Sequence, residues 1–188
     1  MFPMALIVSE WPASTGFDPI KARQVIAYFA RKNGGSIEKL KLTKLIYLSE
    51  RLSFQKRSAP MNFDDFYSMP HGPVPSSSLN VINAKADGIK LHGNLVSASD
   101  EIGNDRLSAN DVAILDQVWG EFGKMSAFQL RNWTHDNCKE YVEVPEGRFT
   151  ISYDEILDAV AVEDSDAIMR ELKFLQREMG RLPGPNGA

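Results

Sequence analysis

Residues 39–54 read KLKLTKLIYLSERLSF and carry the clearest helical pattern in the chain. On a helical wheel, one broad stripe that is apolar except for a serine consists of Leu42, Leu45, Ile46, Leu48, Ser49 and Leu52. The other face carries Lys44, Tyr47, Glu50 and Arg51. So wide a stripe is typical of a helix at the centre of a core, so the pattern predicts a helical domain built around this segment.

Lys41 interrupts this pattern because it projects into the apolar stripe. It lies in the first turn of the helix, so we favour the interpretation that its stem packs on the core while its ammonium reaches solvent. The alternative is a partly buried ammonium that pairs with an acid and orients the loop at residues 70–74. A buried charge without a partner costs several kcal/mol, so that alternative requires the acid.

Capping signals place the other helices. Asp18 precedes Pro19, which is favoured at a first helical position, and Asn33 with the two following glycines ends that helix. Further helices are expected to begin at Ser108, Ser126 and Ser152, each with a polar residue three positions on and flanking apolar residues. Ser126 and Ser152 fit the full capping box, whereas Ser108 has Asp111 where Glu or Gln is usual.

Strand signals are short and few. Residues 141–151, YVEVPEGRFTI, alternate around a Pro-Glu-Gly turn and predict a β-hairpin. Residues 70–78, PHGPVPSSS, predict a turn-rich loop, and a short helix follows from Ser76 to Ala86. Residues 87–107 look irregular apart from a candidate strand from Ile89 to Val96.

The predicted fold class is mainly α (α+β), a compact helical domain with a few short strands or a small β-hairpin. The expected organisation is an N-terminal arm, a core domain, a charged C-terminal helix and a flexible tail, over residues 1–16, 17–162, 163–179 and 180–188.

Composition limits the classes of function. The chain has 188 residues, which suits one domain that needs neither a disulfide nor a metal. Its formal net charge is −4, whereas proteins that neutralise many phosphates carry a basic surplus. The single cysteine, Cys138, excludes an internal disulfide and suits the reducing cytoplasm. No window has ~18 consecutive apolar residues, so we expect a cytoplasmic protein without a membrane span.

The motifs of common enzymes are missing from the sequence. His135 and Cys138 are three residues apart, but two ligands do not make a zinc site, and catalytic Cys–His pairs lie far apart in sequence. The chain has no phosphate-binding glycine loop and no G-x-S-x-G elbow. We therefore expect no catalytic residues, no cofactor and no metal.

DNA binding is the main alternative function. The segment from Lys32 to Arg57 is rich in basic residues and follows a helix and a Gly-Gly turn, an order that fits a helix-turn-helix regulator, perhaps of its own operon. A recognition helix needs an exposed face over most of its length, however, and the broad stripe on residues 41–52 favours a core position. We therefore do not expect nucleic acid as the principal partner.

Three ordered motifs resemble the Panacea-domain family of SocA-like antitoxins (DUF4065). KLTKLIYLSERL at residues 41–52 is similar to the family's K-L-x-K-L-x-Y helix. HGPVPSSSLNVI at residues 71–82 resembles its loop ending in G-P-V, followed by a short helix. LDQVWGEFGKMSAFQLRNWTH at residues 115–135 resembles its third region, with a G-K-x-S turn and a final T-H. The resemblance covers roughly residues 22–160, and His71 departs from it where an aromatic residue is common.

This resemblance implies an antitoxin that neutralises a cognate toxin protein by direct contact. In the SocA-like branch it also implies delivery of the toxin to an ATP-dependent (AAA+) protease. The family has no agreed catalytic residues.

The candidate partner-binding residues combine the matched motifs with the aromatic side chains. They are Lys41, Lys44, Tyr47, Phe66, Tyr67, His71, Gly72, Pro73, Val74, Trp133 and Tyr141. For most of the aromatic residues, and for Trp133 above all, a place in the core is the simpler interpretation. The loop at residues 70–74 either stiffens a turn or contacts the partner directly.

Overall fold

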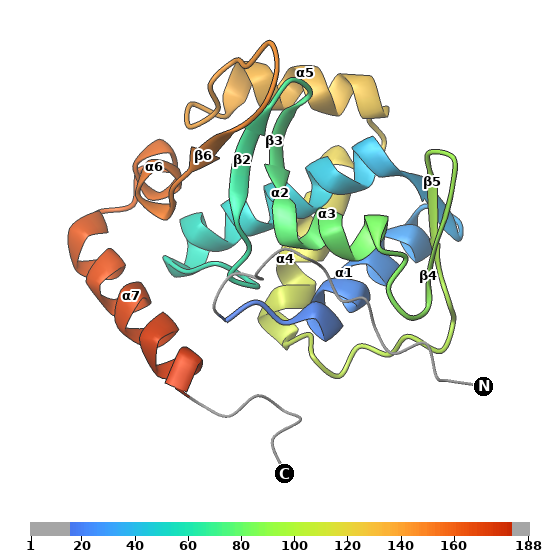
Figure 1. The fold of residues 1–188 in the computed structure, drawn as a ribbon, viewed down its shortest axis with the longest axis horizontal. Helices are drawn as coiled ribbons and strands as arrows, with labels where there is room; N and C mark the ends of the chain where they lie inside the picture. Colours follow the sequence, from blue (N-terminus) through green and yellow to red (C-terminus); the bar gives the residue numbers. More distant parts are fainter. Residues whose placement is uncertain (1–15, 182–188) are drawn as a thin grey trace.

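The chain folds around one central helix, as a computed structural model that describes residues 16–181 shows (Figure 1). The N-terminal arm expected over residues 1–16 and the tail over 180–188 lie almost entirely outside the described residues. The elements in chain order are α1 (Pro19–Lys32), β1 (Ser36–Glu38), α2 (Lys39–Arg57), β2 (Phe66–Met69), β3 (Gly72–Pro75), α3 (Ser76–Asn83), β4 (Ile89–His92), β5 (Leu95–Ala98), α4 (Ala109–Phe122), α5 (Ala127–Asn137), β6 (Phe149–Ile151), α6 (Tyr153–Ala159) and α7 (Ser165–Arg181). The mainly α fold class is confirmed.

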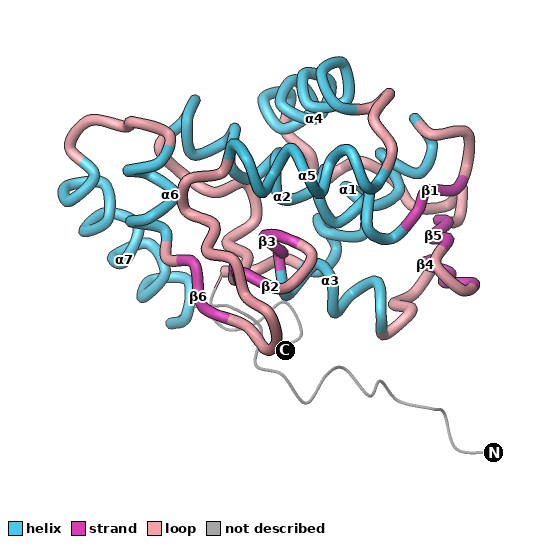
Figure 2. The backbone as a smooth tube through the Cα atoms, turned by 90° about the horizontal axis from the view of Figure 1, so that it is seen from above, coloured by secondary structure: helices cyan, strands magenta, loops and turns pink. Residues whose placement is uncertain are grey.

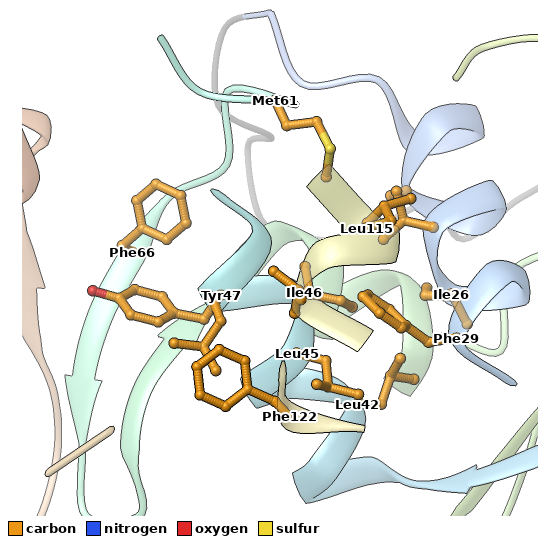
Figure 3. Packing of buried hydrophobic residues seen from close by; sticks show 14 of the residues in the cluster. Ile26, Phe29, Leu42, Leu45, Ile46, Tyr47, Met61, Phe66, Leu115 and Phe122 are labelled. Atoms are coloured by element: carbon orange, nitrogen blue, oxygen red, sulfur yellow. The ribbon is translucent and has the colours of Figure 1, made fainter. Parts of the chain in front are cut away.

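Helix α2 is the element that the others cover. It packs against α1, α4, α5 and α6 and against the strands β1 and β3. Leu42 and Leu45 are completely buried, and Figure 3 shows Leu45 and Ile46 beside Phe29 of α1 and Leu115 of α4. Each fully buried side chain of this kind stabilises the fold by about 1.5–3 kcal/mol, so the stripe read from the sequence does form the core.

The face of α2 that carries Lys44, Tyr47 and Glu50 is buried as well as the apolar stripe. All three are at most 1 % exposed, and only Arg51 keeps partial contact with solvent. The reason is tertiary, because β2, β3 and the segment after α5 cover the face that looks polar on the wheel. Helix α2 is therefore enclosed on all sides over residues 42–50, while Gln55 and Lys56 near its end are exposed.

Side-chain caps fix where the helices begin, as the sequence predicts. Asp18 accepts hydrogen bonds from the amides of the first turn of α1. Complete capping boxes start α4, α5 and α6 at Ser108, Ser126 and Ser152. Asp111 serves in the first box and also pairs with Lys21 at 2.8 Å and Arg57 at 3.0 Å, so an aspartate there joins α4 to α1 and α2.

The strands form two antiparallel three-stranded sheets, in the orders β1-β5-β4 and β3-β2-β6. The hairpin predicted within residues 141–151 was wrong: residues 141–148 form no strand, and β6 pairs with β2 instead. The stretch predicted as a loop at residues 70–78 contains β3 and the first residues of α3, and β3 forms a hairpin with β2. The candidate strand at residues 89–96 is a second hairpin, turned at Gly93 with φ +58°.

Removal of a cap tests the helix starts. Ser126→Ala should lower the free energy of unfolding by about 1 kcal/mol, because the amide of Gln129 loses its acceptor. Ser126→Asn should remain within a few tenths of a kcal/mol of the wild type, since asparagine caps about as well as serine. Urea unfolding followed by circular dichroism measures both, and equal losses for the two variants would contradict a capping role.

Candidate functional site

The β2–β3 hairpin lies against α2 and α5 through β3 (Figure 2). Gly72 begins β3 with φ +94°, in a region that favours glycine. A Cβ atom at this position would lie 2.9 Å from Lys44 Nζ and 3.0 Å from Thr134 Oγ1. The glycine is thus required both by the backbone conformation and by the close approach of the hairpin to the two helices.

Lys44 fixes the position of the hairpin relative to α2. Its side chain is completely buried, and Nζ donates a 2.7 Å hydrogen bond to the carbonyl oxygen of Pro73. The pKa of Lys44 is lowered to about 7, chiefly by burial; Cys138 acts in the opposite direction, and the Arg131 guanidinium adds to the lowering. Orientation of the loop at residues 70–74, which the sequence offered as a role for Lys41, therefore belongs to Lys44.

Lys41 acts elsewhere, at the junction of α2 and α4. Its Nζ donates to the carbonyl oxygen of Gly123 at 2.7 Å and to Asn33 Oδ1 at 3.2 Å, and lies 5.4 Å from the centre of a Trp119 ring. The half-buried ammonium thus contacts the carbonyl end of α4, where a cation is favoured. The alternative in which Lys41 pairs with an acid and orients residues 70–74 is wrong.

Glu140 ties the segment after α5 to the central helix. Its buried carboxylate oxygen Oε1 accepts hydrogen bonds from Tyr47 Oη at 2.6 Å and from Arg51 Nε at 2.8 Å. Burial, followed by the negative charge of Glu140, raises the pKa of Tyr47 far above its usual value, so the phenol remains a donor. The start of the segment that leads from α5 to β6 is therefore anchored to α2.

Two further bonds attach this segment to the hairpin. Tyr141 Oη donates to the carbonyl oxygen of Met69 at 3.1 Å, and the Val142 amide donates to Ser68 Oγ at 3.1 Å. Ser68 is also the cross-strand neighbour of Phe149 in β6. Val142 and Phe149 therefore lie on either side of Ser68, and their side chains are 58 % and 61 % exposed.

We call the accessible side chains around the hairpin and this segment the hairpin surface. It consists of Tyr67, His71, Tyr141, Val142, Arg148 and Phe149. The Arg148 guanidinium, just before β6, lies 4.4 Å from the centre of the Tyr67 ring. Phe149 lies opposite Ser68 and therefore points to the other face of the sheet. An exposed aromatic, an exposed aliphatic residue and an arginine on a rigid frame are the composition of a protein-binding surface.

The candidate residues divide by accessibility. The buried set can act only by positioning the hairpin and comprises Lys44, Tyr47, Phe66, Gly72, Pro73 and Val74. Trp133 is half-buried and packs on Phe122 of α4 at 4.7 Å, away from the hairpin. Tyr67 and Tyr141 are half-buried and His71 is exposed, so these three remain candidates for direct contact.

Sequence reasoning missed Val142 and Phe149. Both stand in the alternating stretch at residues 141–151, where the alternation of a hairpin ordinarily places apolar side chains on a buried face, so the pattern gives no signal that these two are exposed.

The part of the chain that contains this site matches a known protein family. Residues 42–141 match the family model of the antitoxin SocA-like, Panacea domain, which is more than half of the chain. The chain belongs to the SocA-like Panacea-domain family of antitoxins. No curated protein and no solved structure matches it. The Panacea match begins within α2 and ends at Tyr141, so it contains Lys44, the hairpin and α5.

Cys138, at the end of α5, lacks the properties of an activated thiol. Burial raises the pKa of the Cys138 thiol to about 12, and a thiol without thiolate character is a poor nucleophile. Between residues 16 and 181 no three His, Cys, Asp or Glu side chains are grouped so as to hold a metal ion. In the same span no helix is both long and apolar enough to cross a lipid bilayer.

Substitution of Gly72 tests how closely the hairpin packs. Gly72→Ala should lower the free energy of unfolding by about 2–3 kcal/mol, because a strained φ adds to a clash with Lys44 and Thr134. Gly147→Ala is the matched control, since Gly147 has φ +77° and no atom within 4 Å of an added Cβ. It should cost about 1 kcal/mol. Chemical denaturation of both variants checks this, and equal costs would contradict the close approach.

The lowered pKa of Lys44 predicts a pH dependence of stability. Between the folded pKa of about 7 and the ordinary value of 10.5, the unfolded chain binds the proton and the folded chain does not, so stability rises with pH. Lys44→Met removes this rise. The difference in unfolding free energy between wild type and variant should grow in favour of the wild type by on the order of 2 kcal/mol from pH 7.5 to 9.5. A pH-independent difference would mean that the ammonium is not desolvated.

Proposed function

We propose that this chain neutralises a toxin protein in the cytoplasm by direct contact through the hairpin surface. The observation that carries the proposal is the pair of exposed apolar side chains, Val142 and Phe149, on a frame that belongs to an antitoxin family. Membership of that family implies a toxin partner. The hairpin surface supplies the kind of contact that such a partner needs.

The energetics favour a contact at this surface. Burial of a phenylalanine or valine side chain against a partner contributes about 1.5–3 kcal/mol, and aromatic and arginine residues supply most of the binding energy at protein interfaces. The bonds from Glu140, Tyr141 and Ser68 hold the segment in place before binding. Binding by a pre-ordered segment loses less conformational entropy than binding by a flexible loop.

The alternative of a DNA-binding regulator gains no support from α2. The helix that a helix-turn-helix interpretation would place in the major groove is enclosed, with Lys44 completely buried. Together with the net charge of −4, this enclosure favours a protein as the partner.

The proposal extends to the fate of the bound toxin. As a proteolytic adaptor, the chain would present the toxin to an AAA+ protease while its own fold stays intact. The half-life of an epitope-tagged toxin in cells should then shorten when this chain is co-expressed. An unchanged half-life, with growth still restored, would limit the mechanism to blocking.

Growth rescue tests the proposal. The product of the adjacent reading frame should arrest growth when expressed alone, and co-expression of this chain should restore growth. Phe149→Ala should weaken binding of the purified toxin by about tenfold or more, because an exposed aromatic anchor is lost.

The matched control is Phe128→Ala. Phe128 is 70 % exposed at the start of α5, far along the helix from Asn137 where the segment toward the hairpin surface begins, so this variant should bind like the wild type. Failure of the wild type to restore growth would remove the proposal. Loss of binding in Phe128→Ala with full binding in Phe149→Ala would move the interface to the other end of α5.

A further inference from the structure

The sheet β3-β2-β6 has a determined hydrogen-bond register. The Ser76 amide donates to the carbonyl oxygen of Asp65 at 2.7 Å, across the pair formed by Phe66 and Pro75. In an antiparallel ladder, successive residues point their backbone groups to opposite sides. Asp65 and Tyr67 therefore bond toward β3, and Phe66 and Ser68 bond toward β6.

The β3 edge of this sheet is closed. Pro73 and Pro75 lie opposite Ser68 and Phe66, so they occupy the positions at which a backbone N–H would point away from the sheet, and proline has none. The outward carbonyl oxygen of Pro73 accepts the hydrogen bond from Lys44 Nζ. This edge is also buried under α2 and α5.

The β6 edge is open. Ser68 and Phe66 bond to their partners Phe149 and Ile151, which leaves the amide and carbonyl of Thr150 pointing away from β2. Within the described residues no hydrogen bond reaches this amide or carbonyl, and Thr150 is exposed. Phe149, beside it, keeps 61 % of its side chain in solvent. Figure 2 shows β6 as the outer strand next to β2.

The difference between the β3 edge and the β6 edge indicates which kind of partner fits at β6. Proteins usually protect an edge strand with proline, charge or a covering element. Within residues 16–181 the β3 edge has two prolines and covering helices, whereas β6 has no proline and the backbone groups of Thr150 have no hydrogen-bond partner. An amide and a carbonyl that point outward from one residue are matched by the backbone of an extended polypeptide. An apolar side chain on that polypeptide would pack on Phe149, which belongs to the edge strand itself.

We propose that an extended segment of the toxin adds to β6 as a fourth strand. Its backbone bonds to the Thr150 amide and carbonyl, and one of its apolar side chains packs against Phe149. This inference rests on the proposed function and specifies its geometry: main-chain bonds supply affinity that depends little on sequence, and Phe149 supplies selectivity.

Proline at position 150 tests the inference. Because the Thr150 amide bonds to nothing in β2, Thr150→Pro should leave the sheet and the melting temperature nearly unchanged, as expected for proline on an open edge. It should weaken binding of the adjacent reading frame's product by about tenfold or more in titration calorimetry. Thr150→Ala, which keeps the amide, should bind like the wild type.

Amide hydrogen exchange gives a readout that needs no variant. In the free chain the Thr150 amide should exchange quickly, while the Phe149 and Ile151 amides, which bond to β2, exchange slowly. In the complex the Thr150 amide should become protected.

The outcomes separate the two proposals. If the wild type does not neutralise the toxin, the proposed function fails and this inference fails with it. If it neutralises the toxin while Thr150→Pro binds equally well and the Thr150 amide stays unprotected, strand addition is wrong and the proposed function stands. If protection at Thr150 appears in the purified chain alone as its concentration rises, β6 pairs with a second copy, and the toxin is not its occupant.

Discussion

The burial of one ammonium group is the constraint on which the rest of the structure depends. Lys44 is removed from water in the middle of α2, and the acceptor for its proton is the carbonyl oxygen of Pro73. Desolvation of a charge is so unfavourable that the position of this carbonyl relative to the helix is strongly constrained. The hairpin turn, with glycine at position 72, lies directly against this contact, since a Cβ atom at Gly72 would lie 2.9 Å from Lys44 Nζ.

Other polar groups of the core act in the same way on the chain that follows α2. Glu50 is buried and accepts a 2.6 Å hydrogen bond from the Met61 amide, and Asp64 accepts from the amides of Ser77 and Ser78. Burial raises the pKa of Glu50 to about 8 and that of Asp64 to about 6. The polar side chains of the core thus define where the loop after α2 runs and where α3 begins.

The sequence predicts the helices well because helix starts are local. The serine caps and the apolar stripe of α2 are contained in a few neighbouring residues, and all of them are confirmed. The strands are less predictable because pairing partners lie far apart: β6 looks like half of a local hairpin, yet it joins β2 some eighty residues earlier. The burial of Lys44 cannot be read from a wheel for the same reason, since it depends on the distant hairpin and on residues at and after α5.

The family match ends at Tyr141, whereas Phe149 and Thr150 lie beyond it. The outward edge of β6 thus takes no part in the packing of the described domain. Substitutions at these exposed positions leave the interior of the domain undisturbed. Under the strand-addition proposal, the residues that select the partner can therefore vary here without loss of the scaffold.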